Sequence, residues 1–238
     1  IDKVIYYYSL AAKQNDIDAQ YILGLIYING LGVERNIDKA IKYFFKAANQ
    51  NHLESQKKLG TIYYTGKFVK PDIDKVIYYL TLAAEQNDPD AQYNLASIYF
   101  EAKFVKRDIN KAIKYFTLAA NQNDAMSQFN LGLIYFSTIY DKQDINKSLN
   151  YYTLAANQKH SEALYELGRI YYKGENAKKD IRKAISYLTC ASDQGNTKAQ
   201  CKLGCIYDKS LNIEGAIYYY TLAADKNDVN AQYNLGCI

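Results

Sequence analysis

The sequence predicts an all-α fold, a right-handed α–α superhelix (solenoid) of about seven 36-residue helix-turn-helix repeats. Three observations lead to this prediction: a short motif recurs at a constant spacing, each period holds two amphipathic helix patterns, and prolines are rare. Only two prolines occur in 238 residues, so long uninterrupted helices are allowed throughout the chain. Hydrophobic residues make up 49% of the sequence, which is enough apolar surface to build a core.

A related seven-residue motif opens every repeat. It reads IDKVIYY at Ile1 and IDKAIKY at Ile37, and its further copies begin at Ile73, Ile109, Ile145, Ile181 and Ile213. The copies are 36 residues apart except for a last step of 32, because the loop around Ser210 has lost four residues. We therefore expect residues 1–238 to form a single solenoid domain, with repeats beginning near residues 1, 37, 73, 109, 145, 181 and 213.

Each repeat period contains two helix patterns, which we name helix A and helix B. Helix B begins with the motif, and in the second repeat it runs from Asp38 to Asn49 with apolar residues at three- and four-residue steps. Helix A precedes it, from about Asp18 to Ile28, and its apolar face consists of Ala19, Leu23, Ile26 and Tyr27. Because each helix pair buries only one face of each helix, neighbouring repeats must complete the core.

A small residue stands at one position of every helix A. Glycine inside a helix is less favourable than alanine by about 1 kcal/mol, so a repeated glycine requires a structural reason. We expect a neighbouring helix to approach closely at this position, which is occupied by Gly24, Gly60, Ala96, Gly132, Gly168, Gly204 and Gly236.

The connections from helix B to the next helix A carry residues that end and begin helices. Asn or Gly suits a left-handed position after helix B, as at Asn15, and the Asp or Asn that follows can cap the next helix, as at Asp16. Lys159 breaks this pattern, and local backbone strain is expected there. His52 and His160 fall on the capping position, so solvated caps are expected rather than catalytic or metal-binding side chains.

Tyrosine is unusually frequent, with 26 residues. The repeat accounts for much of this excess, because tyrosines recur at the helix-B position of Tyr7 and Tyr43 and at the helix-A position of Tyr27 and Tyr63. We expect these rings to be core aromatics whose hydroxyl groups reach the rim of the solenoid.

Composition and motifs exclude several classes of protein. Lys and Arg (29) exceed Asp and Glu (25) by four, and the two signs are interspersed, so no basic patch for nucleic acid is expected. No apolar run approaches the length of a membrane span and no leader pattern opens the chain, so we expect no membrane insertion and a cytoplasmic location. Acidic pairs such as Asp16 and Asp18 stand at helix starts, where they favour the helix dipole. No loop carries the Gly-Lys-Ser/Thr of a phosphate site, and we expect no catalytic residue, metal ligand or cofactor.

Several segments match one known repeat pattern. They are Ala91-Gln92-Tyr93-Asn94-Leu95, Gly30-Leu31-Gly32-Val33, Lys39-Ala40 and Ala119-Ala120-Asn121-Gln122-Asn123. The chain thereby resembles the Sel-1-like repeat family, whose solenoid fold is similar to that of tetratricopeptide repeats. The Gly-x-Gly-Val loop is intact only in the first connection from helix A to helix B, and Cys190 and Cys201 lack the spacing of the cysteine pairs in secreted members. The resemblance implies a non-enzymatic adaptor or scaffold for protein–protein interaction.

The resemblance also implies that helix A lines the concave face, where a peptide or protein partner would bind. Helix-A residues at the positions of residues 22, 25 and 28 point away from the core, and position 28 is mostly aromatic. Tyr, Phe and Arg often anchor interfaces, and the amides of Asn94 and Asn130 can bond to a peptide backbone. The alternative for the aromatic series is packing beneath the loops that join helix A to helix B. The candidate binding residues are Tyr64, Asn94, Ser97, Phe100, Asn130, Leu133, Phe136, Glu166, Arg169 and Tyr172.

Two further hypotheses come from other features of the chain. It opens with an unpaired helix B and ends inside a helix A, so we expect part of a longer protein, or an end-to-end homo-oligomer through uncapped ends. If the chain is part of a longer protein, the repeats would be a regulatory or oligomerising arm of a larger signalling enzyme such as a kinase. The last alternative is a metal-binding protein that uses Cys201, Cys205 and Cys237, the first two of which lie one helical turn apart.

Overall fold

The computed structural model describes residues 2–174 and 176–238, so Ile1, the expected start of the first repeat, lies outside the described residues. Within these ranges the chain forms fourteen helices and no strand. The packing divides the chain into two compact units, one ending at Ala119 and the other beginning at Ala120. Because this boundary falls within one helix, we describe each unit by itself.

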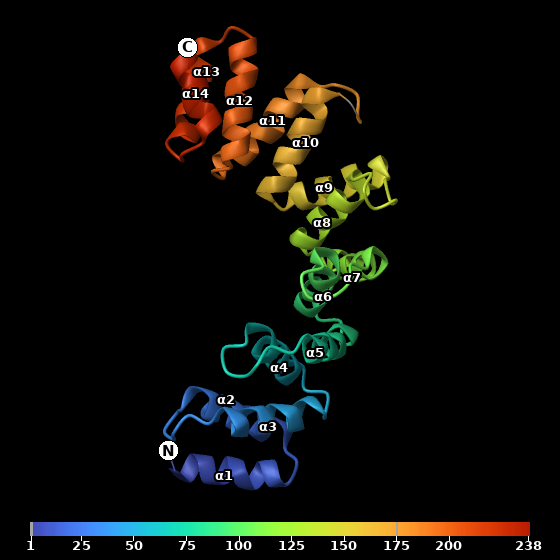
Figure 1. Cartoon of the computed structure of the whole chain (residues 1–238), viewed down its shortest axis with the longest axis vertical. Helices are drawn as coiled ribbons and strands as arrows, with labels where there is room; N and C mark the ends of the chain where they lie inside the picture. The colour runs from blue at the N-terminus through green and yellow to red at the C-terminus, as the bar shows by residue number, and fades with distance from the viewer. Residues whose placement is uncertain (1, 175) are drawn as a thin grey trace. The chain divides into compact units, whose positions relative to one another are not determined.

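The first unit consists of stacked helix pairs, drawn from blue to green in Figure 1. Within this unit each helix A packs against the helix B that follows it, and the first three helices B each pack against the next helix A. The helices are α1 (Asp2–Lys13), α2 (Ile17–Asn29), α3 (Ile37–Ala48), α4 (Leu53–Thr65), α5 (Ile73–Glu85), α6 (Pro89–Glu101) and α7 (Ile109–Asn121).

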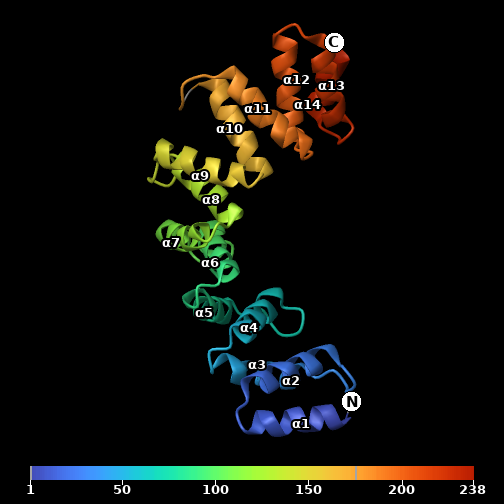
Figure 2. The same ribbon diagram turned by 180° about the vertical axis from the view of Figure 1, so that it is seen from behind.

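The second unit repeats the same arrangement and is drawn from yellow-green to red in Figure 2. Its helices are α8 (Ala125–Phe136), α9 (Ile145–Asn157), α10 (Ser161–Lys173), α11 (Ile181–Asp193), α12 (Thr197–Lys209), α13 (Ile213–Ala224) and α14 (Val229–Cys237). Even-numbered helices are helices A and odd-numbered helices are helices B. The predicted all-α solenoid of helix-turn-helix repeats is confirmed.

The helices begin and end at the predicted capping residues. Before α2, the Asp16 carboxylate accepts a hydrogen bond from the backbone N–H of Ala19 at 2.7 Å. The second or third residue beyond the end of each helix B is left-handed, as at Asn15 with φ 65°. Lys159 adopts the same conformation with φ 61°, which is unfavourable for a side chain with a Cβ atom and confirms the strain expected there. These contacts satisfy backbone groups that a helix end leaves without partners.

The two histidines cap helices as predicted, and both are only partly exposed to solvent. Nδ1 of His52 accepts from the N–H of Ser55, and Nδ1 of His160 accepts from the N–H of Ala163, both at 3.2 Å. The His160 ring stacks on Phe129 with the ring centroids 4.7 Å apart, and its side chain is only 11% exposed. Burial lowers the pKa of His160, because the charged imidazolium is poorly solvated there.

Close helix approach explains the small helix-A residue at some positions only. A Cβ atom at Gly24 would lie 2.5 Å from the Phe44 ring, and equally close neighbours face Gly132, Gly168 and Gly204. At Gly60 the nearest atom, in Leu80, would lie 3.4 Å away, and among the described residues nothing lies within 4 Å of a Cβ atom at Gly236. The predicted close approach is therefore wrong at Gly60, where a Cβ atom has room, and it stays untested at Gly236, because no helix B follows this residue among those described.

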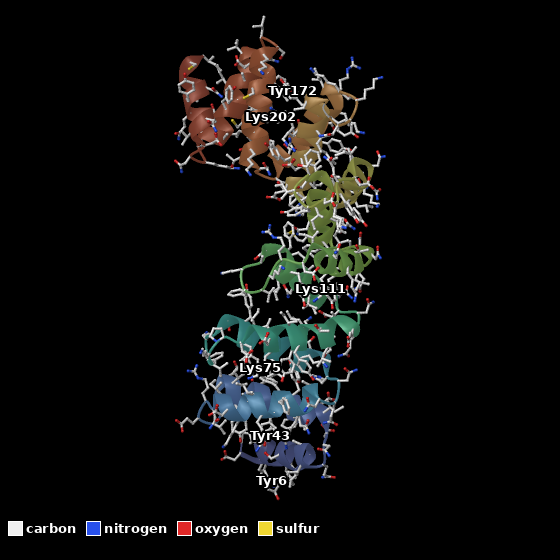
Figure 3. All side chains as sticks on the ribbon, turned by 45° about the vertical axis from the view of Figure 1, so that its right-hand side comes forward. Tyr6, Tyr43, Lys75, Lys111, Tyr172 and Lys202 are labelled. Carbon is white, nitrogen blue, oxygen red and sulfur yellow. The ribbon has the colours of Figure 1, made fainter. Side chains whose placement is uncertain are left out.

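The repeated tyrosines form stacked pairs between helix A and helix B that pack against the core, most of them partly buried and Tyr79 buried. The rings of Tyr27 and Tyr43 are nearly parallel, with an interplanar angle of 3° and centroids 5.8 Å apart. Nζ of Lys39, in the first turn of α3, lies 5.0 Å from the centroid of the Tyr27 ring. The same cation–π contact recurs in later repeats, and the lysines of two of them can be found in Figure 3 as Lys75 and Lys111. Stacking and cation–π attraction thus stabilise each helix pair at its edge.

A buried glutamine on helix A is a second repeated feature, which the sequence analysis did not predict. Gln56 donates to the carbonyl of Ala48 at 3.3 Å and accepts from Gln86 at 2.7 Å. The same pairing joins Gln50 to Gln20 and Gln158 to Gln128. At Gln200 the repeat places Lys226 where the partner glutamine would stand, and in the described part of the chain the buried Oε1 of Gln200 accepts no hydrogen bond.

Candidate protein-binding surface

Three of the predicted binding residues line one groove in the first unit. Tyr64 of α4 and Asn94 and Ser97 of α6 border a hollow of about 260 Å³, which we call the helix-A groove. Its other lining residues are Gly60, Thr61, Val76, Leu80, Tyr93, Ile98, Glu101, Lys103 and Phe104. Val76, Leu80 and Ile98 belong to the buried core, so the floor of the groove is apolar.

The helix-A groove exists because a smaller side chain replaces an aromatic ring on helix B. The other six repeats carry Tyr8, Phe44, Phe116, Tyr152, Leu188 and Tyr220 at the position of Leu80. Leu80 leaves space beside Gly60, whereas the Phe44 ring fills the space beside Gly24. Thr61 on the neighbouring helix is also small. Replacing a ring by leucine is not sufficient by itself, since Leu188 lies tightly against Gly168.

The rim of the helix-A groove carries exposed rings and charges. The rings of Tyr64 and Phe104 meet edge to face with centroids 5.9 Å apart, and they are 50% and 49% exposed. Nζ of Lys103 lies 5.0 Å from the centroid of the Phe104 ring. Large rings that are half exposed beside an apolar hollow are typical anchors of interfaces.

A second hollow continues the groove toward the start of α6. Its lining shares Thr61, Leu80, Tyr93 and Asn94 with the helix-A groove and adds Lys57, Asp90 and Ala91. Nζ of Lys57 pairs with the carboxylate of Asp88 at 2.9 Å and with that of Asp90 at 3.2 Å. Partial burial by itself would lower the pKa of Lys57, but the hydrogen bonds to Asp88 and Asp90 raise it above its ordinary value, so the ammonium is charged at neutral pH.

Phe100 does not line the helix-A groove. Its ring packs against that of Phe116 with centroids 6.2 Å apart and an interplanar angle of 73°. Phe100 thus packs on a ring of helix B, which is neither the groove nor the predicted alternative of packing beneath a loop between helix A and helix B, and its role in partner binding stays a prediction.

In the second unit, three predicted residues form one cluster on α8 and α10. Nη2 of Arg169 pairs with Oε2 of Glu166 at 2.7 Å, and its guanidinium carbon lies 5.3 Å from the centroid of the Phe136 ring. Phe136 and Leu133 also pack against the buried core, so they are only partly exposed. The cluster therefore presents a guanidinium and a carboxylate whose geometry is already fixed.

Tyr172 and Asn130 stand apart from this cluster. Nζ of Lys202 lies 4.7 Å from the centroid of the Tyr172 ring, and Figure 3 labels both residues. The side-chain N–H of Asn130 donates to the carbonyl of Met126 at 2.9 Å, within α8. Asn94, by contrast, is exposed at the edge of the helix-A groove. The two asparagines that the sequence grouped as one peptide clamp thus differ in environment.

Several groove residues were not predicted, namely Thr61, Tyr93, Lys103 and Phe104. A signal for them was present in the sequence, because Leu80 interrupts a series of rings on helix B. Lys103 and Phe104 lie in a loop whose conformation the repeat pattern did not determine.

The chemistry of the described residues adds two observations. No cluster of three or more His, Cys, Asp or Glu side chains among them is arranged to hold a metal ion. None of their helices combines the length and apolar character needed to cross a membrane.

Stacked two-helix repeats with a groove along helix A define the class of helical-repeat interaction proteins. The Sel1 repeat model matches residues 5–16, 17–52, 53–88, 89–124, 125–160, 161–196 and 197–228. The chain therefore belongs to the Sel1 repeat family, and the resemblance seen in the sequence is confirmed. Proteins of this family generally mediate protein–protein interactions and are generally non-enzymatic.

Solved structures agree with this assignment. A protective antigen of uropathogenic Escherichia coli strains, described as having an SLR fold, is 29% identical with a TM-score of 0.84; the match covers 96% of this chain and 50% of that one. A Sel1 repeat protein from Oxalobacter formigenes is 29% identical with a TM-score of 0.88, and the match covers 99% of this chain and 69% of that one. Yeast Tom70 shares the fold alone: it is 17% identical with a TM-score of 0.52, and the match covers 93% of this chain and 46% of that one. The chain thus spans half the length of the E. coli protein. No curated protein sequence gave a match.

Proposed function

We propose that this chain is a non-enzymatic scaffold or adaptor that holds an extended segment of a partner protein against its helix-A face. The observation that supports this most strongly is the helix-A groove, which combines an apolar floor with half-exposed rings and polar edges. A groove of this kind suits a large apolar side chain of the partner, while the exposed amide of Asn94 suits its backbone. In the second unit, Arg169, Glu166 and Tyr172 are a separate candidate contact for a partner, independent of the helix-A groove.

Charges at the two ends of the groove favour one direction for the bound segment. Lys103 stands beside Phe104 at one end, and the exposed carboxylate of Asp90 stands at the other. A segment with an acidic residue near Lys103 and a basic residue near Asp90 would match these charges.

The test uses peptides selected from a random display library on the folded wild-type chain. Their affinities are then measured by fluorescence anisotropy for wild type and for Leu80→Phe. A ring at this position fits beside the small helix-A residue in other repeats, so the variant should fold while its ring fills the groove. We expect the affinity to fall at least about tenfold, because an anchoring pocket is lost.

Tyr78→Ala is the matched control, since Tyr78 lies on the same helix as Leu80 but is 55% exposed outside the groove. Its affinity should equal that of wild type. Selected peptides that bind Leu80→Phe as tightly as wild type, or the failure of any peptide to be enriched, would contradict the proposal.

A further inference from the structure

Two loops beside the helix-A groove carry the same four-residue motif. One loop, residues 66–72, joins α4 to α5 and contains Lys67-Phe68-Val69-Lys70. The other, residues 102–108, joins α6 to α7 and contains Lys103-Phe104-Val105-Lys106. We call these two segments the lysine loops. The motif occurs nowhere else in the sequence, so it is confined to the two repeats whose helices A border the groove.

The two lysine loops are anchored to the solenoid in the same way. Each begins with a left-handed residue, which is Gly66 with φ 62° in one loop and Ala102 with φ 57° in the other. The aspartate that ends each loop donates its backbone N–H to the carbonyl of a helix-A tyrosine, at 3.2 Å from Asp72 and at 3.1 Å from Asp108. The valine of each motif packs against the buried core. Loops that are already ordered present their lysines to a partner at a small cost in conformational entropy.

The rings of the two motifs hold cations near the end of the helix-A groove. Nζ of Lys67 lies 5.3 Å from the centroid of the Phe68 ring, and the guanidinium carbon of Arg35 lies 5.6 Å from the same centroid. The ring of Phe104 meets that of Tyr64, which stands two residues before the first lysine loop begins. This contact joins the second lysine loop to the start of the first, so the lysines of both loops gather at one edge of the first unit.

The positive charge of the lysine loops is not neutralised within the described part of the chain. All four lysines of the two motifs are exposed, and none of them forms an ion pair with a described carboxylate. The aspartates that end the loops are engaged elsewhere, because Asp72 pairs with Lys75 at 3.2 Å and Asp108 pairs with Lys111 at 3.8 Å. Glu101 is the one other carboxylate among the residues of the loops and of the groove lining, and four ammonium groups surround this edge. The edge therefore attracts negative charge.

We propose that the lysine loops bind a run of acidic residues in the partner segment whose apolar side chain occupies the helix-A groove. This inference rests on the proposed function for the apolar anchor, and it adds the composition of the segment beside that anchor. Several Asp or Glu side chains are needed, because a single exposed ion pair contributes little to affinity. A protein segment is favoured over a membrane surface because the ring of Phe104 packs against Tyr64 at the rim of the groove, whereas a membrane-inserting loop would project its ring outward.

The experiment measures the binding of fluorescein-labelled octaglutamate to the full chain by fluorescence anisotropy. The salt concentration is about 0.1 M, where charges farther than about 10 Å from the probe are screened. Wild type should bind octaglutamate and should not bind a Gly-Ser octapeptide that carries the same label. The double variant Lys70→Gln, Lys106→Gln removes one ammonium group from each lysine loop, and neither residue lines the groove. Because each exposed ion pair contributes a factor of about 1.4 to 5, its affinity for octaglutamate should fall about sixfold.

The double variant Lys42→Gln, Lys114→Gln is the matched control, because it changes the net charge equally at two exposed lysines that share one position of helix B. It should bind octaglutamate as wild type does, and circular dichroism establishes that both double variants are folded. Leu80→Phe should leave octaglutamate binding unchanged, so a failure of the helix-A groove as an anchoring site is distinguished from a failure of the lysine loops.

Three results would overturn the proposal. The first is binding of octaglutamate no tighter than that of the Gly-Ser octapeptide. The second is an equal affinity of the two double variants for octaglutamate. The third is binding of phosphatidylserine vesicles or of oligothymidylate without binding of octaglutamate, which would assign the edge to a membrane surface or to nucleic acid.

Discussion

Two glycines at the same repeat position should respond in opposite ways to alanine. In a helix interior, alanine is more favourable than glycine by about 1 kcal/mol. At Gly24 a Cβ atom would lie 2.5 Å from the fully buried Phe44 ring, which cannot move away. Overpacking of this kind costs about 1–3 kcal/mol, and so short a contact places Gly24→Ala near the upper end. We therefore expect a net loss of about 2 kcal/mol in the free energy of unfolding.

Gly60→Ala should stabilise the same unit instead. The nearest atom, Cδ2 of Leu80, lies 3.4 Å from a Cβ atom at this position, so a small shift of a flexible side chain accommodates it. The helix preference then remains as a gain of about 0.5–1 kcal/mol. Urea unfolding followed by circular dichroism should place the midpoints of Gly24→Ala and Gly60→Ala on opposite sides of wild type. Equal midpoints for the two variants would refute the packing that we infer beside the helix-A groove.

Three further changes follow from single contacts. Burial lowers the pKa of His160, so the stability that its neutral ring contributes is complete above the unfolded pKa of about 6.5 and is lost as the pH falls below that value. In His160→Asn the amide still accepts a hydrogen bond from the N–H of Ala163, so the urea midpoint should lose this dependence on pH. An unchanged pH profile of the midpoint would refute the assignment. Lys226→Gln should give the buried Oε1 of Gln200 a partner and stabilise the chain by about 1 kcal/mol, so a lower urea midpoint would contradict the glutamine pairing. Lys159→Gly should relieve the left-handed strain at φ 61° and raise the thermal midpoint by an amount equivalent to about 1 kcal/mol in the free energy of unfolding. A lower midpoint would show that the lysine side chain stabilises the chain by more than the strain destabilises it.

Most of the fold could be predicted because each feature is encoded locally and recurs. The repeat spacing determined where helices pair, and residues such as Asn15 and Asp16 marked the helix ends. What could not be predicted depends on contacts between residues distant in sequence. The pairing of Gln56 with Gln86 is one example, since a glutamine on helix A reads as polar surface until its partner in the next helix pair is known.

The candidate site could be predicted only in part, for a related reason. Exposure on helix A was deduced from periodicity, which correctly identified Tyr64, Asn94 and Ser97 as neighbours of an open surface. Periodicity cannot report how much space remains beneath such residues. That space depends on Leu80 of α5 and on the loop that carries Phe104, neither of which belongs to helix A. The partner-binding role of all ten candidate residues stays a prediction.

Amide chemical-shift mapping shows directly whether the helix-A groove binds the partner. A peptide selected on wild type is titrated into the isotope-labelled chain. If the peptide binds in the groove, the largest shift changes should occur at Thr61, Asn94 and Ser97, and they should be lost in Leu80→Phe. Shift changes confined to the exposed faces of helices B, such as around Tyr78, would contradict it.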